Sequence, residues 1–145
     1  MKNQLIIALV QAGFLSVTNN TIENEAYKVV KLRSVLKGAF GKVQELEEAL
    51  LKDCGIEDAD AFNAELKALA EIKKPSKEDE KKIADMRSKS EKFNRMESDM
   101  LNDEQELAFA PMSYDTWHSM VLESHIKVSA ELEDAVMGVL WVESE

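Results

Sequence analysis

Apolar residues recur at alternating steps of four and three between Ile22 and Cys54, and this long repeat constrains the fold more than any other feature. Eight of its ten positions are apolar, among them Val29, Leu36 and Val43. Such spacing places side chains on one face of a helix. Five glycines and two prolines in 145 residues allow few tight turns. The sequence therefore predicts a mainly α protein.

The limits of this first long helix follow from its flanking residues. Asn20 and Glu23 have the spacing of a capping box, and Gly55 is a typical residue just beyond a helix. We expect a helix over residues 21–54, roughly 50 Å long. Gly38 and Gly41 within it indicate either a close helix contact or a bend.

Two further helices follow. Asp58 or Asp60 can cap a helix whose apolar face carries Phe62, Leu66, Leu69 and Ile72. Pro75 breaks the pattern, so a hinge is expected near residues 73–77. Ser76 then caps a second long helix, whose ridge comprises Ile83, Met86, Ser90, Phe93, Glu97 and Met100.

The two long ridges predict a long antiparallel helical hairpin, in which the ridge from Ile22 packs along the ridge from Ile83 within one domain, residues 1–145. Polar residues interrupt both ridges. They either set the register or oligomeric state, or lie at an exposed rim; they are Arg33, Glu47, Ser90 and Glu97.

The helical spacing ends near residue 102. Residues 107–109 and 126–128 predict two short strands that pair as a small antiparallel β element in the C-terminal part. Ser113 or Asp115 can cap a short helix between them. Ser129 can cap a short final helix, with an expected buried face of Leu132, Ala135, Val136, Val139 and Leu140.

Three aromatic residues, Phe109, Tyr114 and Trp117, lie within nine positions of this region. Their large apolar area predicts that they anchor the C-terminal part to the helices. The functional alternative is an exposed interaction surface, to which Met120 on the same short helix would contribute. Core anchoring is favoured because large exposed apolar patches are uncommon on monomers.

Charge is unevenly distributed along the chain. The formal net charge is −10; residues 1–95 carry 17 Lys/Arg against 16 Asp/Glu, and residues 96–145 carry 1 against 12. No basic patch is indicated, so direct nucleic-acid binding is not expected. The acidic subregion over residues 97–145 favours a basic protein partner, imitation of nucleic acid, or only solubility.

Candidate catalytic and metal-ligating residues are few. Cys54, the only cysteine, falls on the apolar ridge, where a small buried residue is the usual role. His118 and His125 would share a face of a continuous helix and, with Asp115 or Glu123, make a surface metal site conceivable. We expect no catalytic residues, no cofactor and no metal, and hence no enzyme.

The apolar run over residues 5–10 is too short before Gln11, and lacks the cleavage pattern, for a signal peptide. It predicts instead a short core helix that ends near Gly13. No segment has the ~20 apolar residues that span a bilayer, so we expect a cytoplasmic protein without membrane contact.

The order of a capped long helix, a hinge, a second long helix reaching "FNRMESDMLNDEQELAF", an extended stretch and "SAELEDAVMGVL" resembles small uncharacterised proteins encoded by tailed bacteriophages and prophages. The resemblance covers most of residues 20–142 and is one of layout. It implies an intracellular protein of a phage life cycle with no assigned activity, so no functional residues are carried over.

These observations predict a non-enzymatic helical protein-interaction protein, acting in assembly or as an accessory factor. It would bind a protein partner, or itself as a homo-oligomer, because one chain need not cover so wide an apolar stripe. One alternative is an acidic inhibitor that imitates nucleic acid. Another is an enzyme or metal-binding protein that uses His118 and His125.

Overall fold

The computed structural model describes residues 1–18 and 25–143, and their fold is mainly α, as predicted. The elements, in chain order, are α1 (Asn3–Ala12), η1 (Phe14–Ser16), α2 (Ala26–Asp53), α3 (Ala59–Ala70), α4 (Lys77–Asn102), β1 (Met112–Ser113), α5 (Tyr114–Glu123), α6 (Ala130–Ala135) and β2 (Trp141–Val142).

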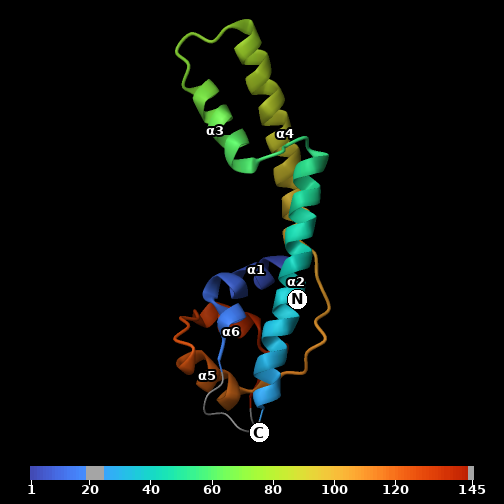
Figure 1. Cartoon of the computed structure of the whole chain (residues 1–145), viewed down its shortest axis with the longest axis vertical. Coiled ribbons are helices and arrows are strands. Elements are labelled where there is room, and N and C mark those ends of the chain that lie inside the picture. Colours follow the sequence, from blue (N-terminus) through green and yellow to red (C-terminus); the bar gives the residue numbers. More distant parts are fainter. Residues whose placement is uncertain (19–24, 144–145) are drawn as a thin grey trace. The chain divides into compact units, whose positions relative to one another are not determined.

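The chain divides into two compact units. Their residues can be found in Figure 1, whose colours follow the sequence. Unit 1 combines residues 1–43 with residues 102–145, and unit 2 comprises residues 44–101. The boundary between them falls inside the continuous helix α2. The single domain expected from the sequence therefore stays a prediction.

Helix α1 is the short core helix that the sequence predicts. Ile6 and Leu9 are fully buried, and the helix ends at Gly13, whose φ of +106° lies in the left-handed region that favours glycine. The Asn3 N–H donates to the Asp103 carbonyl over 2.9 Å, and the Gln105 N–H donates to the Met1 carbonyl over 2.9 Å. These bonds attach the start of α1 to the segment that enters the C-terminal half of unit 1.

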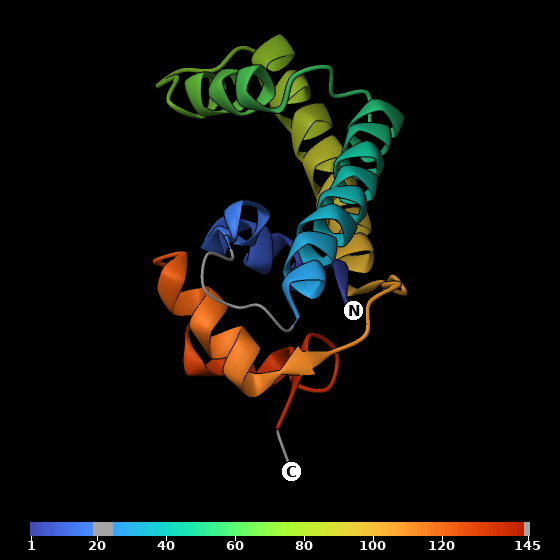
Figure 2. The ribbon, with the colours of Figure 1, turned by 60° about the horizontal axis from the view of Figure 1, so that its bottom comes forward.

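The core of unit 1 forms on the buried side of α2. Val29, Leu32 and Leu36 are fully buried there. Figure 2 shows α1 and α5 on the same side of α2. The remaining buried members of this core are Leu9, Phe14, Val17, Met112, Trp117, Met120, Val136, Leu140 and Trp141.

The predicted pairing of the two long ridges is wrong for residues 29–36. This part of α2 fills the core of unit 1, where α1, α5 and the C-terminal segment supply a wider apolar surface, with aromatic rings, than a single ridge from Ile83 offers. The predicted start of the ridge at Ile22, and the capping box of Asn20 and Glu23, lie outside the described residues.

The small β element is present but differs from the predicted one. Strands β1 and β2 pair in parallel, with Met112 opposite Trp141. The predicted antiparallel pairing of residues 107–109 with residues 126–128 is wrong, because Phe109 and Val128 pack against the core from irregular segments. A parallel pair needs a long connection, and here α5 and α6 supply it.

Two predicted caps in the C-terminal half are confirmed. Ser113 Oγ accepts from the Thr116 N–H at the start of α5 over 3.3 Å, and Ser129 Oγ accepts from the Leu132 N–H at the start of α6 over 3.1 Å. The predicted buried face of the last helix is only partly right. Helix α6 ends at Ala135, and the residues after it do not continue its buried face. Val136 and Leu140 are buried, whereas Val139 is exposed.

The helix starts in unit 2 also follow the sequence. Asp58 Oδ1 accepts from the Ala61 N–H over 3.0 Å at the start of α3. The Asp79 N–H donates to Ser76 Oγ and the Ser76 N–H donates to Asp79 Oδ2, each over 3.1 Å. This reciprocal pair is a capping box at the start of α4, which begins at Lys77, the last residue of the predicted hinge at residues 73–77.

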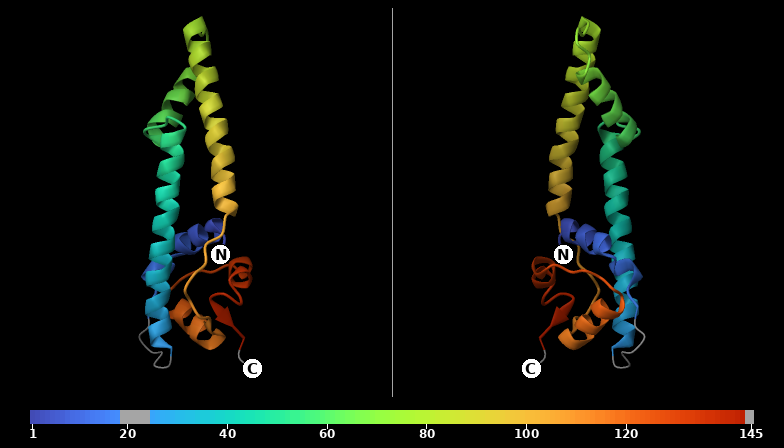
Figure 3. Two further views of the ribbon diagram at one scale, coloured as in Figure 1. Left: turned by 90° about the vertical axis from the view of Figure 1, so that its right-hand side faces the viewer. Right: turned by 90° about the vertical axis from the view of Figure 1, so that its left-hand side faces the viewer.

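The C-terminal part of α2 runs antiparallel to α4, so the predicted hairpin exists within unit 2. Asp53 lies 3.5 Å from Lys92, and Glu47 faces Glu97 five residues further along α4. Figure 3 shows the two chain directions from two sides. An ion pair between Glu65 and Lys82 joins α3 to α4.

The interior of unit 2 is small. Only Cys54, Ile56, Met86 and Met100 are buried among residues 44–101, and α3 contributes no buried side chain. Cys54 thus has the expected role of a small buried residue. Few buried apolar groups in a unit of this size indicate low local stability.

Candidate interaction surface

The four residues proposed from the sequence as an interaction surface do not form one. Trp117 and Met120 are fully buried, and the Trp117 ring stacks on Phe14 with ring centres 5.1 Å apart. Phe109 and Tyr114 are partly buried and pack against the same core. The burial of these side chains confirms the favoured interpretation, that they anchor the C-terminal part.

The two histidines do not share a helix face. Helix α5 ends at Glu123, and His125 has a positive φ of +54° outside the helix, while His118 stacks on Tyr114. Among the described residues, no three His, Cys, Asp or Glu side chains gather closely enough to hold a metal ion. The continuous helix that would have placed His118 and His125 on one face, and made a metal site conceivable, therefore does not extend to His125.

A polar cluster around Glu25 joins the start of α2 to the start of α5. Glu25 Oε1 accepts hydrogen bonds from Ser113 Oγ and Thr116 Oγ1, each over 2.7 Å, and from the Ser113 N–H over 3.2 Å. Glu25 Oε2 lies 2.9 Å from Lys28 Nζ, which donates to the Pro111 carbonyl over 2.8 Å.

The electrostatics of this cluster suit a structural role. Burial raises the pKa of Glu25, but the hydrogen bonds from Lys28, Ser113 and Thr116 outweigh burial and lower this pKa to about 2. A carboxylate so acidic is a weak proton acceptor at neutral pH. Both of its oxygens are occupied by these partners, so the cluster fastens unit 1 together.

Two ridge carboxylates face each other in unit 2. Burial raises the pKa of Glu97, and the negative charge of Glu47 raises it further. The folded state therefore holds this proton more tightly than the unfolded chain does. The charged form of Glu97 lowers stability at neutral pH, and this cost disappears as the pH falls below the carboxyl's ordinary range.

Replacing Glu97 by glutamine should raise the stability of unit 2 at pH 7. We expect a gain of a few tenths to about 1 kcal/mol, because like-charge repulsion between partly exposed groups is of that size. Urea denaturation at pH 7 and near pH 4 measures the gain, which should shrink at the lower pH. The matched control is Glu91→Gln, an exposed change on the same helix; destabilisation by Glu97→Gln at pH 7 would contradict the prediction.

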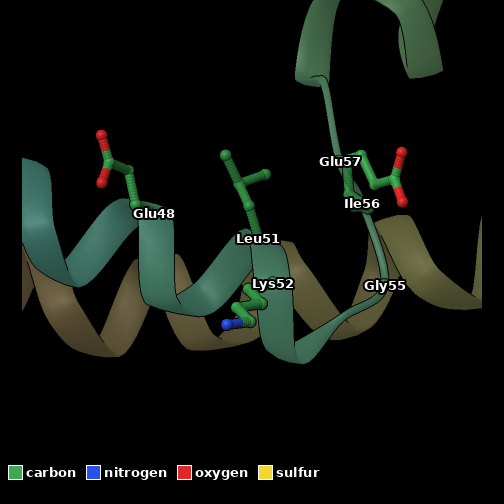
Figure 4. A pocket seen from close by; sticks show the side chains of 6 residues that line it. All are labelled: Glu48, Leu51, Lys52, Gly55, Ile56 and Glu57. Atoms are coloured by element: carbon green, nitrogen blue, oxygen red, sulfur yellow. The ribbon is translucent and has the colours of Figure 1, made fainter.

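A hollow in unit 2 follows the end of α2, and Figure 4 shows it from close by. Its volume is about 490 Å³. Glu48 and Leu51 project from one side of α2, Lys52 projects away from them, and Glu57 lies on the following connection. The charged groups diverge, so this hollow offers no group of converging polar atoms of the kind that orients a small molecule.

The exposed side of α2 in unit 1 is the surface with the clearest binding character. Tyr27 is 72% exposed and Val30 is 50% exposed, on the side of the helix opposite Val29, Leu32 and Leu36. A shallow hollow of about 530 Å³ adjoins Val30. We call this surface the α2 face, and its residues are Leu15, Tyr27, Val30, Arg33, Ser34 and Lys37.

Charge on the α2 face is of one sign. Residues 26–44 contain five Lys/Arg and no Asp/Glu, although the whole chain has an excess of acids. The basic residues are Lys28, Lys31, Arg33, Lys37 and Lys42. Lys28 pairs with Glu25 inside unit 1 and so does not belong to the α2 face. The sequence-based statement that no basic patch exists is therefore wrong at this scale, because counts over residues 1–95 average this segment with its acidic neighbours.

Sequence reasoning overlooked the α2 face, although a signal was present. Tyr27 and Val30 lie off the apolar ridge, on a helix whose other off-ridge positions are mostly polar. The glycines at 38 and 41 belong to the same exposed side, and an added Cβ at either would meet no atom of residues 1–18 or 25–143 within 4 Å. Among the described residues, therefore, no close helix contact explains these glycines.

None of the helices in the described part of the chain is long and apolar enough to cross a bilayer. Comparison with family models, with curated proteins and with solved structures finds no match to this chain.

Proposed function

We propose that this chain is a non-enzymatic protein-interaction protein, and that its α2 face binds an acidic, partly apolar segment of a protein partner. One observation carries the proposal: two exposed apolar side chains, Tyr27 and Val30, lie within residues 26–44, which contain no acidic residue and four basic ones besides the Lys28 that pairs with Glu25.

The physical argument is one of complementarity. Exposed apolar side chains with a charged rim are typical of binding surfaces, and tyrosine is among the residues that contribute most to binding energy. Charges of a single sign speed the approach of an oppositely charged partner and help to exclude others. The reverse side of α2 is fixed in the core of unit 1, so the face is presented on a rigid helix and little ordering accompanies binding.

The biological setting belongs to the same proposal. The resemblance in layout to small proteins of tailed bacteriophages and prophages is what supports an assembly or accessory role in the cytoplasm of an infected cell. The gene neighbourhood tests this part. Capsid or tail genes beside the coding sequence would support it, and a metabolic operon would argue against it.

The binding role is tested by purifying the tagged chain from its native cells and identifying co-purifying proteins by mass spectrometry. Val30→Asp combined with Lys37→Glu places acidic groups on the α2 face at exposed positions. We expect recovery of the partner to fall about tenfold or more, since each 1.4 kcal/mol of lost binding energy is a factor of ten. The partner should carry an acidic segment.

The matched control is Leu122→Asp, which puts a carboxylate on another strongly exposed apolar residue, on α5. It should leave the recovery unchanged. Equal recovery by the wild type and the α2-face variant would contradict the proposal. Recovery of nucleic acid in place of a protein would show that the basic face binds phosphates instead.

A further inference from the structure

The C-terminal segment of unit 1 has the opposite chemistry to the α2 face. Residues 130–143 contain four acids and no Lys/Arg. Three apolar residues among them are exposed: Met137 at 46%, Val139 at 38% and Val142 at 42%. We call the exposed acidic and apolar residues of this segment the acidic strip; they are Glu131, Asp134, Met137, Val139, Val142 and Glu143.

The acidic strip and the α2 face lie on opposite sides of the core of unit 1. Val136, Leu140 and Trp141 of the C-terminal segment pack in the same core as the buried side of α2. Figure 3 shows the red C-terminal segment and the start of α2 at opposite edges of unit 1. The acidic strip of a chain therefore cannot cover the α2 face of the same chain.

We propose that the partner of the α2 face is the acidic strip of a second copy of this chain. This inference rests on the proposed function and names its partner. Each surface has exposed apolar side chains beside charges of a single sign, and the two signs are opposite. Contact between them would pair Lys and Arg with carboxylates while removing Tyr27, Val30 and Met137 from water.

The geometry of this contact determines how the copies assemble. The two surfaces differ and lie on opposite sides of unit 1, so each copy keeps one free surface after the first contact forms. Such a head-to-tail contact adds further copies into a ring or an open chain, whereas a symmetric contact stops at a dimer. Open growth of this kind suits an assembly protein.

The contact is expected to be weak and sensitive to salt. The surfaces are small, and small interfaces give weak, transient association. We expect a dissociation constant on the order of 10–100 μM. Exposed charges are screened within about 3 Å at 1 M salt but within about 10 Å at 0.1 M. Sedimentation velocity should therefore show species larger than a dimer that grow with protein concentration and diminish at high salt.

The decisive experiment uses two variants that each lack one surface. Val30→Asp with Lys37→Glu removes the α2 face, and Asp134→Lys with Met137→Lys removes the acidic strip; all four positions are exposed. Each variant alone should remain a monomer at concentrations where the wild type associates. An equimolar mixture should form a one-to-one dimer, because one variant keeps its acidic strip and the other keeps its α2 face. This dimer should not grow, since neither variant has a second intact surface.

The matched control is again Leu122→Asp, which should associate like the wild type, and circular dichroism verifies that every variant is folded. A monomeric wild type at several hundred micromolar, on the order of ten times the expected constant, would overturn the inference. So would association of either variant alone, or a mixture that stays monomeric. If the wild type is monomeric but a cellular protein still depends on Val30 for recovery, this inference fails and the proposed function stands.

Discussion

Replacing Trp117 by alanine is expected to lower the free energy of unfolding of unit 1 by about 3–5 kcal/mol, the usual cost of removing a large buried aromatic side chain. Trp117 is fully buried and stacks on Phe14 with an angle of 15° between the ring planes. The loss is a large fraction of the 5–15 kcal/mol that stabilises a typical domain. Urea denaturation followed by far-ultraviolet circular dichroism measures it.

A phenylalanine at the same position isolates the contribution of the ring. Trp117 Nε1 is buried, and no acceptor among the described residues bonds to it. Trp117→Phe removes this unsatisfied donor and keeps a ring against Phe14, so we expect it to cost less than about 2 kcal/mol.

Tyr27→Ala is the matched control for an aromatic residue that the solvent already reaches. It should change stability by no more than about 0.5 kcal/mol. Equal losses for Trp117→Ala and Tyr27→Ala would contradict the assignment of Trp117 as an anchor of the core.

The local features of the fold could be predicted from the sequence because local interactions determine them. Caps by Asp58, Ser76 and Ser129 depend on side chains that reach backbone N–H groups two or three residues away. The end of α1 at Gly13 depends on one backbone conformation that glycine adopts readily. Each of these predictions is confirmed within a residue or two.

The partners of the apolar ridges could not be predicted in the same way. A stripe of apolar side chains on a helix can pack against any apolar surface of suitable shape. The ridge of α2 packs on two different sets of partners. Up to Leu36 they are the rings and C-terminal segment of unit 1, and near Cys54 the neighbour is helix α4 of unit 2. Uniform spacing along α2 gives no sign of this change.

The parallel pairing of β1 and β2 was missed for a related reason. Each strand has two residues, which is too short for an alternating pattern. The pairing follows from how α5 and α6 place the two segments, with the Met112 N–H donating to the Leu140 carbonyl over 2.9 Å. Alternation at residues 126–128 predicted a strand, but those residues pack as an irregular segment.

The α2 face was not predicted because the sequence does not show which side chains of α2 are buried and which are exposed. Composition distinguishes Tyr27 from Trp117 only weakly, since both are aromatic residues near polar neighbours. The structure places Trp117 inside the core and leaves Tyr27 mostly exposed. The chemistry of a binding surface is therefore visible in the sequence only after the side that faces the core is known.

Replacing Glu25 by glutamine should destabilise unit 1 by about 2 kcal/mol at pH 7, because hydrogen bonds to a charged acceptor contribute more than those to a neutral one. Glutamine can still accept from Ser113 and Thr116, but it loses the ion pair with Lys28. Urea denaturation gives the difference, and Glu106→Gln, an exposed change in the same unit, is the matched control.

The pH dependence of this loss identifies its electrostatic origin. The pKa of Glu25 is about 2 in the folded state against an ordinary value of 4.5, so the folded chain binds fewer protons than the unfolded chain between these values. The stability that Glu25 contributes is present in full above the ordinary value and is lost as the pH falls toward 2. The difference between the wild type and Glu25→Gln should therefore shrink steadily from about pH 5 to pH 2. A difference that stays constant over this range would assign the effect to shape alone and contradict a charged Glu25 as the group that fastens α2 to α5.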